Sequence, residues 1–234
     1  MTRLAKPVLL LAAATALFVA AVAPPLDRLA DRSFAWHMLQ HLVMLFPVPL
    51  LVLLARPFDL FVQVAGKGAA AGLVRATQPL HALAPPPVVL TVFLATLWAT
   101  HFSALYELSL EWPALHVFEH LLYVAAGIAF WLPVVAPPPL RPLAYPARLL
   151  YLAVALPQGA LLGMVIGSSP KPLYAHYVAA AGSVSSALAD QADAAAVMWI
   201  AGGFVVFSAF LLTLASWACR EAERVGRNEA GGEA

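Results

Sequence analysis

The chain has 234 residues, of which 62% are hydrophobic and 11% are charged, whereas roughly 25% of the residues in an average soluble domain are charged. A soluble core does not need this much apolar sequence, and a net charge of +1 indicates no nucleic-acid partner. One cysteine, Cys219, excludes an intrachain disulfide framework and a thiolate metal cluster. We therefore expect an all-α protein, a polytopic bundle of transmembrane helices in the lipid bilayer, with residues 1–234 forming a single integral membrane domain.

Long apolar runs predict about six spans, because a helix of ~20 apolar residues crosses the hydrocarbon core. The runs cover residues 7–23, 35–55, 88–106, 114–135, 147–168 and 194–218. The first run has the flanking charges of a signal peptide, but its length and the following Pro24-Pro25 favour an uncleaved anchor. Residues 60–84 carry Lys67, Arg75 and several glycines, so we expect a surface loop that can include a short interfacial helix.

Small and helix-breaking residues predict how the spans pack. Within 147–168 the glycines repeat every four residues, which lets a neighbouring helix approach closely: Gly159, Gly163 and Gly167. Pro47 and Pro49 predict a kink in the second span. Asp190 precedes the last span and is expected to be the N-cap of that helix.

Basic residues predict the orientation, because cytoplasmic segments of membrane proteins are enriched in Lys and Arg. With the N-terminus in the cytoplasm, ten of the 13 basic residues fall inside: Arg3, Lys6, Arg56, Lys67, Arg75, Arg141, Arg148, Arg220, Arg224 and Arg227. The outer segments hold Arg28, Arg32 and Lys171. We therefore expect both termini in the cytoplasm and residues 219–234 as a cytoplasmic tail.

Two histidine pairs share one spacing. His37 and His41 lie in the second span, and His116 and His120 lie in the fourth. Residues at i and i+4 project from one face of a helix, so each pair presents two imidazoles to a common point.

The predicted topology places these pairs in one layer. Each pair lies about 3 and 9 Å below the outer end of its span, at ~1.5 Å per residue, and His101 of the third span is roughly 8 Å deep. Glu119 is the acid among these residues, and it could be a ligand, a partner that fixes a histidine tautomer, or a proton acceptor. The candidate metal ligands are therefore His37, His41, His101, His116, His120 and Glu119.

Imidazole suits copper, zinc, iron and nickel, and thioether shifts the preference towards Cu(I). All four internal methionines fall in the outer half of the predicted bundle, which makes copper the first choice: Met38, Met44, Met164 and Met198. A haem-binding redox protein with two axial histidines is the main alternative, although it leaves the doubled spacing unexplained. In a third hypothesis, a scaffold, the histidines only pack or bind lipid.

Three blocks resemble the CtaG-type cytochrome c oxidase assembly factors. The first is His37-Met38-Leu39-Gln40-His41 followed by Pro47 and Pro49. The second runs from Leu105-Tyr106-Glu107 through His116-Val117-Phe118-Glu119-His120 to Trp131-Leu132-Pro133, and the third is Asp190-Gln191 with Met198-Trp199.

The resemblance implies a non-enzymatic, multi-pass protein of the bacterial inner membrane that helps to assemble haem–copper oxidase. Its partners would be cytochrome c oxidase subunits, to which it delivers copper from the outer face. The matching residues by position are His37, His41, His116 and His120, with His101 and Glu119 beside them.

Overall fold

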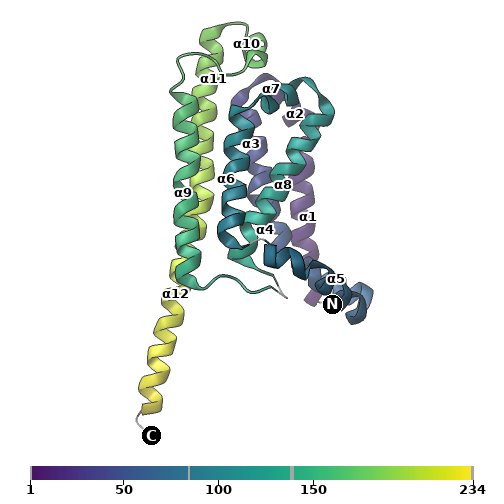
Figure 1. The fold of residues 1–234 in the computed structure, drawn as a ribbon, viewed down its shortest axis with the longest axis vertical. Coiled ribbons are helices and arrows are strands. Elements are labelled where there is room, and N and C mark those ends of the chain that lie inside the picture. The colour runs from purple at the N-terminus through teal and green to yellow at the C-terminus, as the bar shows by residue number, and fades with distance from the viewer. Residues whose placement is uncertain (1, 84, 138–139, 233–234) are drawn as a thin grey trace.

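The computed structural model describes residues 2–83, 85–137 and 140–232, and the regular structure in these ranges is helical (Figure 1). The first half contains α1 (Thr2–Val22), α2 (Pro24–Arg32), α3 (Phe34–Leu45), α4 (Pro47–Leu54), α5 (Pro57–Leu83), α6 (Pro86–Phe102) and α7 (Ala104–Glu111). The second half contains α8 (Pro113–Val135), α9 (Tyr145–Gly167), α10 (Ala175–Ala181), α11 (Val184–Val197), the π-helical turn η1 (Met198–Gly202) and α12 (Gly203–Gly232). The predicted all-α class is confirmed.

Among the described residues, five helical segments are long and apolar enough to cross a membrane. They are Leu4–Val22, Phe34–Leu54, Pro113–Val135, Tyr145–Gly167 and Val184–Asn228. A sixth span results if α6 and α7 are counted together, although they meet at a bend of 67°. The predicted multi-pass bundle is therefore confirmed at five to six spans.

Two predicted spans have different bounds from those expected. The run 88–106 is not one helix, because α6 ends at Phe102 and the Ser103 side chain caps α7 by accepting a hydrogen bond from the backbone N–H of Leu105. The last span begins at Val184 instead of residue 194, since Ser183 caps it by accepting from the N–H of Ser186. Hydropathy placed that start too late because α11 contains two aspartates.

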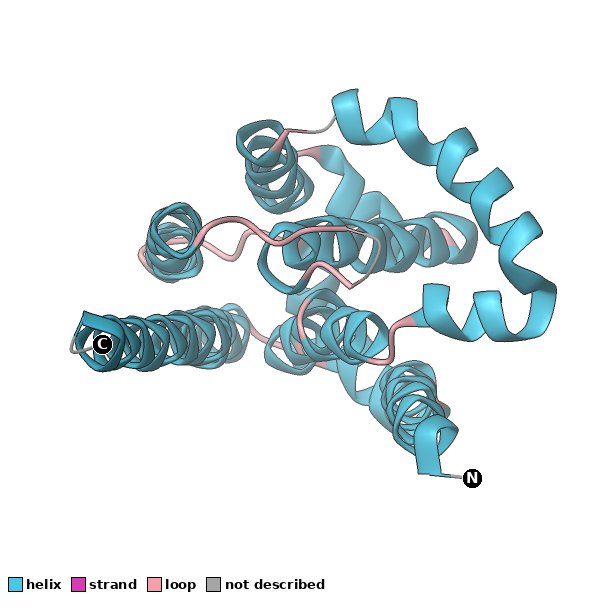
Figure 2. Cartoon of the chain, turned by 90° about the horizontal axis from the view of Figure 1, so that it is seen from below, coloured by secondary structure: helices cyan, strands magenta, loops and turns pink. Residues whose placement is uncertain are grey.

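Residues 60–84 were predicted as a surface loop that can include a short interfacial helix, and the structure contains more helix than this. Residues 60–83 belong to α5, which is helical on both sides of a break at Gly66, where φ is +83°. Figure 2 shows the two arms of α5 running round one side of the bundle. Because α5 is not among the candidate spans, the sequence count of spans is unaffected.

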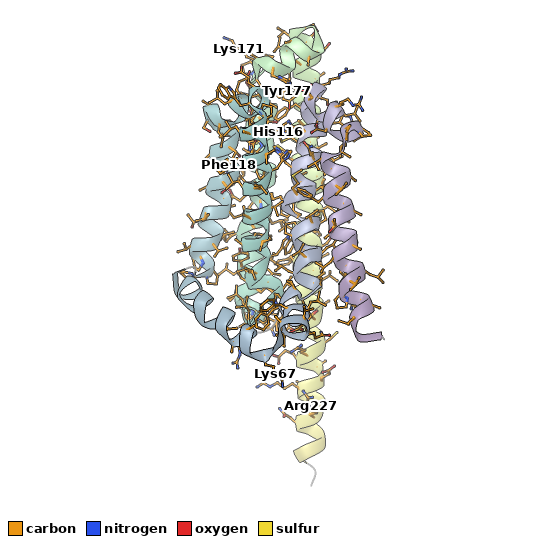
Figure 3. All side chains as sticks on the ribbon, turned by 90° about the vertical axis from the view of Figure 1, so that its right-hand side faces the viewer. Lys67, His116, Phe118, Lys171, Tyr177 and Arg227 are labelled. Carbon is orange, nitrogen blue, oxygen red and sulfur yellow. The ribbon has the colours of Figure 1, made fainter. Side chains whose placement is uncertain are left out.

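The bundle has two chemically different ends. Figure 3 shows His116, Tyr177 and Lys171 towards one end and Lys67 and Arg227 towards the other. We call the first the histidine end and the second the basic end. In Figure 1, α1 begins and α12 ends at the basic end, as an even number of spans requires.

The break between α3 and α4 positions α3 against α8. Proline has no N–H, so Pro47 and Pro49 interrupt the helical hydrogen bonds here, as predicted. The indole N–H of Trp131 on α8 donates to the carbonyl of Phe46 at 3.1 Å. A Cβ on Gly127 of α8 would collide with the carbonyl oxygen of Leu45, so glycine allows the two backbones to touch.

The glycines of α9 pack on the last span, as their spacing predicted. A Cβ on Gly163 would lie 2.7 Å from the carbonyl oxygen of Ala195, and one on Gly167 would lie 3.0 Å from the Ala195 Cβ. This contact joins α9 to α11 along the side of the bundle in Figure 1.

Asp190 caps a different helix from the predicted one. It lies inside α11, and its carboxylate accepts from the Ser33 hydroxyl at 2.6 Å and from the N–H groups of Phe34 and Ala35 at 2.5 and 3.3 Å. These groups form the N-terminus of α3, where the helix leaves N–H donors unpaired. Asp190 therefore anchors the start of the helix that carries His37.

Candidate metal centre

Four histidines meet between α3 and α8 at the histidine end. Their candidate ligand nitrogens all lie within 4.8 Å of one another, and we call this group the four-histidine cluster: His37, His41, His116 and His120. The Nε2 atoms of His37 and His41 are 2.9 Å apart. Between the helices, the ring centroids are 5.2 Å apart for His37 and His116 and 5.4 Å for His41 and His120. The packing of α3 on α8 thus brings both i,i+4 pairs to one point.

The nitrogens of this cluster are poorly supplied with hydrogen-bond partners. His37, His41 and His120 are buried and His116 is half-buried. Among the described residues, no group hydrogen-bonds to Nδ1 of His41, Nε2 of His116 or Nε2 of His120. Leaving a buried polar atom unpaired costs about 1–3 kcal/mol, and a ligand that binds the Nε2 atoms of His116 and His120 would offset that cost.

The arrangement suits a transition-metal ion. A metal with nitrogen ligands at about 2.0–2.1 Å in tetrahedral geometry separates those nitrogens by about 3.3 Å. The His37–His41 separation of 2.9 Å already falls near this value, and the 4.8 Å limit leaves only small side-chain shifts for the others. The residues present therefore fit a metal held by imidazole.

Tyr177 of α10 reaches the cluster from outside the two helices. Its hydroxyl lies 2.6 Å from Nδ1 of His37 and 3.4 Å from the carbonyl of Ala30, to which it donates. Burial raises the pKa of the Tyr177 hydroxyl well above its ordinary value, so the group stays neutral. The Nδ1–H of His37 can then donate to this oxygen, which leaves Nε2 of His37 free for a metal.

The structure does not bring His101 into the cluster. Its Nδ1 lies 2.7 Å from the carbonyl oxygen of Leu97, and its Nε2 lies 3.3 Å from the sulfur of Met38. The Tyr106 ring contacts both histidines, with its centroid 5.7 Å from the His101 ring and 5.4 Å from the His37 ring. The sequence predicted one layer for His101 and the cluster, but its spacing could not indicate that the ring nitrogens of His101 face Leu97 and Met38.

Glu119 also lies outside the cluster. The side chain is fully buried, and its Oε2 accepts a hydrogen bond of 2.6 Å from the hydroxyl of Ser109 on α7. At three residues from His116, it projects from α8 about 60° away from that ligand, towards α7. Glu119 therefore ties α7 to α8 next to the histidines.

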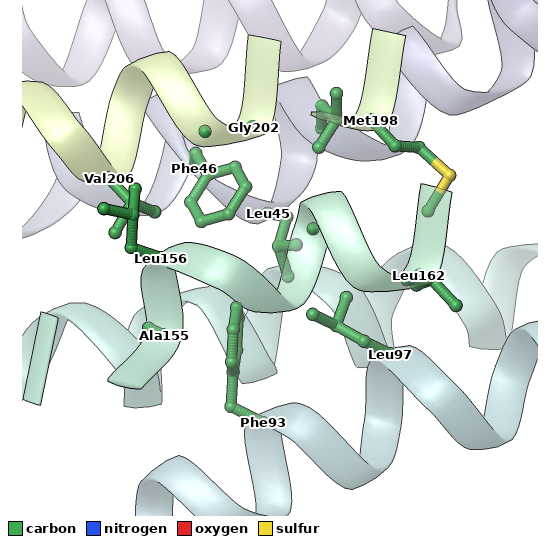
Figure 4. A pocket seen from close by; sticks show the side chains of 13 residues that line it. Leu45, Phe46, Phe93, Leu97, Ala155, Leu156, Leu162, Met198, Gly202 and Val206 are labelled. Atoms are coloured by element: carbon green, nitrogen blue, oxygen red, sulfur yellow. The ribbon is translucent and has the colours of Figure 1, made fainter. Parts of the chain in front are cut away.

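The methionines divide between several environments. Met38 contacts His101, while Met44 is fully buried and Met164 is 64% exposed on the surface of α9. Met198 lines an apolar pocket between α3, α6, α9 and α12, with Leu45, Phe93 and Val206 (Figure 4). Among the residues lining this pocket there is no histidine or acid, so it offers no imidazole or carboxylate ligand.

Comparison with known proteins identifies the family. The family model of the cytochrome c oxidase caa3 assembly factor (Caa3_CtaG) matches residues 4–220. The chain belongs to this family. The match covers every histidine of the cluster and all candidate spans except the end of the last. The predicted resemblance is thus confirmed over most of the chain.

Two curated relatives of the chain are uncharacterised mycobacterial proteins, Mb0105 of Mycobacterium bovis and MT0111 of Mycobacterium tuberculosis. Each is 24% identical over 208 residues, covering 84% of the chain and 31% of the relative. The chain therefore spans less than a third of the length of these relatives. No solved structure matches it significantly.

Sequence reasoning missed several residues around the centre. Tyr177 and Ser109 carry no spacing signal, because they come from α10 and α7 and reach His37 and Glu119 only in the folded chain. Tyr106 belongs to a block that carried the resemblance, but its contact with the His37 ring was not predicted. His176 lies outside the cluster, and its Nε2 lies 2.7 Å from the carbonyl oxygen of Asp31. The side chain of His81 lies outside the described residues.

Proposed function

We propose that this caa3 assembly factor binds copper through the four-histidine cluster and supplies it to the oxidase during assembly. The observation that carries the proposal is that four imidazoles offer nitrogens within 4.8 Å of one another and that three nitrogens of these rings are buried without a hydrogen-bond partner. Neutral imidazole is a good copper ligand, and copper binds more tightly than zinc to a nitrogen site of given geometry. Copper is a cargo in this proposal, and the protein is not an enzyme.

The orientation supports uptake at the outer face of the bacterial inner membrane. Lys67 and Arg227 lie at the end opposite to the histidines, and basic segments favour the cytoplasm. The histidine end would then face the periplasm or its equivalent, from where copper could reach the oxidase subunits. The four-histidine cluster holds the cargo between α3 and α8, and α10 closes the site through Tyr177.

The same geometry argues against the haem alternative. Two axial histidines need a flat slot for the porphyrin between their rings. Four ligand nitrogens within 4.8 Å leave no such slot, and the apolar pocket of Figure 4 has no histidine in its lining. A single ion is the ligand that this cluster suits.

The test measures metal in the protein and oxidase in the cell. Wild type purified from copper-replete cells should retain copper by elemental analysis, whereas the single variants His120→Gln and His41→Gln should lose most of it. His176→Gln is the matched control, since glutamine keeps a donor for the Asp31 carbonyl and His176 lies outside the cluster.

Cells that carry either cluster variant should also lose oxidase activity and oxidase-bound copper, while the control keeps both. Gel filtration and thermal unfolding of each variant separate loss of binding from loss of folding. Normal oxidase activity with a folded, copper-free variant would overturn the proposed delivery. A strong Soret band in the wild type would favour haem instead.

A further inference from the structure

A second pair of soft ligands lies beside the cluster. Nε2 of His101 is 3.3 Å from the sulfur of Met38, and the two residues are 5% and 1% exposed. Met38 follows a cluster histidine on α3, and His101 is the last residue but one of α6. The pair thus connects a third helix to the metal centre.

The hydrogen bonds of His101 decide which ring nitrogen carries the proton. A backbone carbonyl can only accept, so the 2.7 Å contact to Leu97 requires an N–H on Nδ1. In the neutral ring, Nε2 then has a free lone pair and faces Met38. A thioether sulfur has no proton to donate. Two electron-pair donors therefore meet in a buried place without a hydrogen between them.

A second proton on His101, at Nε2, would supply the missing hydrogen between the two atoms, but at a high cost in free energy. It would create a buried imidazolium, and within the described ranges His101 forms no ion pair with a carboxylate. An unpaired buried charge costs several kcal/mol. A metal cation differs because it forms a coordinate bond to each of the two atoms and thereby offsets its loss of hydration.

We propose that His101 and Met38 form a second metal site, selective for Cu(I) and separate from the four-histidine cluster. Thioether combined with imidazole favours Cu(I) over harder ions. Bonds of about 2.0 Å to nitrogen and 2.3 Å to sulfur, typical of first-row metals, separate the two atoms by about 3.5 Å at a tetrahedral angle. The observed 3.3 Å is close to this value. The inference rests on the proposed function only in taking copper as the cargo.

A pocket at the histidine end reaches His101, one of the two proposed ligands. It opens at the break between α6 and α7 and is lined by His101, Ser103, Glu107 and Tyr174 among others. One carboxylate oxygen of Glu107 accepts from the N–H of His176, and the other is buried without a hydrogen-bond partner. An anionic side chain beside His101 attracts a cation into the pocket.

We expect copper to pass from the second site to the first, because Met38 follows the cluster residue His37 on α3. The Tyr106 ring contacts the rings of both His101 and His37. Transfer is a ligand exchange, in which the bonds from copper to Met38 and His101 break as bonds to cluster imidazoles form. Copper stays Cu(I), and no oxidant or reductant is required. The pair therefore receives the ion, and the cluster retains it.

The test loads the purified full-length protein anaerobically with excess Cu(I), removes free metal, and measures bound copper and its X-ray absorption. Wild type should show both nitrogen and sulfur scattering. Met38→Leu, which conserves volume, should lose the sulfur shell and roughly half of the bound copper, since it removes one of two sites. Met44→Leu is the matched control, because Met44 is an equally buried methionine of α3.

The outcomes separate this inference from the proposed function. His120→Gln should lose cluster copper but keep the copper bound to sulfur, if the two sites are separate. Wild type without a sulfur shell, or Met38→Leu with unchanged copper and scattering, would refute the second site and leave the cluster untouched. Loss of sulfur scattering in Met44→Leu would show that Met44 is the sulfur ligand, which would also refute the second site at Met38.

Discussion

Tyr177→Phe tests whether α10 prepares His37 for metal binding. The substitution removes only the hydroxyl that lies 2.6 Å from Nδ1 of His37, and it keeps the ring stacked on Phe34 at a centroid distance of 5.3 Å. Loss of a hydrogen-bond partner behind a ligating histidine typically lowers metal affinity about 10–100-fold, or about 1.4–2.7 kcal/mol. The folding free energy should change by only about 1 kcal/mol.

The assay is a competition titration of copper between the purified protein and a chromophoric chelator. Tyr151→Phe is the control, because Tyr151 is a buried tyrosine whose hydroxyl donates to the backbone carbonyl of Phe130, away from the cluster. The control should bind copper like the wild type. If Tyr177→Phe also bound copper with unchanged affinity, the hydrogen bond to His37 would have no role in the site.

Three further predictions concern the framework and the ligand. Gly127→Ala places a Cβ against the carbonyl of Leu45, so α3 must move away from α8. The substitution should destabilise the protein by about 1–3 kcal/mol and weaken copper binding. Unchanged thermal unfolding and copper affinity would contradict this contact. Asp190→Ala removes the acceptor for three groups at the start of α3, so the free energy of unfolding should fall by about 1–3 kcal/mol. A variant as stable as the wild type would mean that water replaces the carboxylate as the acceptor. Copper at 100 times the dissociation constant of the cluster should stabilise wild type by about 2.7 kcal/mol through that site in thermal unfolding, and His120→Gln should lose this contribution. An equal shift in both proteins would place the metal outside the cluster.

Much of the architecture follows from local sequence properties. Apolar runs predict the spans because a bilayer requires satisfied backbones over a fixed thickness. The i,i+4 spacing of His37 and His41 predicts a shared face, which the cluster shows. The glycine spacing of α9 predicts close packing, which Gly163 shows against Ala195.

The features that the sequence did not predict depend on contacts between distant segments. Asp190 has the local appearance of a cap for its own helix, yet its carboxylate binds Ser33, 157 residues away. The bend after Phe102 was missed because the apolar run continues through it. The helical arms of α5 were missed because Lys67, Arg75 and several glycines gave the segment the composition of a loop. His101 was predicted in the same layer as the cluster, but its ring nitrogens face Leu97 and Met38, and no spacing rule contains that information.

The most direct measurement is the copper X-ray absorption spectrum of the purified protein loaded with less than one equivalent of copper. Because the cluster retains the ion, we predict a shell of imidazole nitrogens at about 2.0 Å with the outer scattering of histidine rings. His41→Gln should reduce this scattering, and His176→Gln should leave it unchanged. A spectrum without imidazole scattering, or one identical in His41→Gln and wild type, would contradict a copper site at the four-histidine cluster.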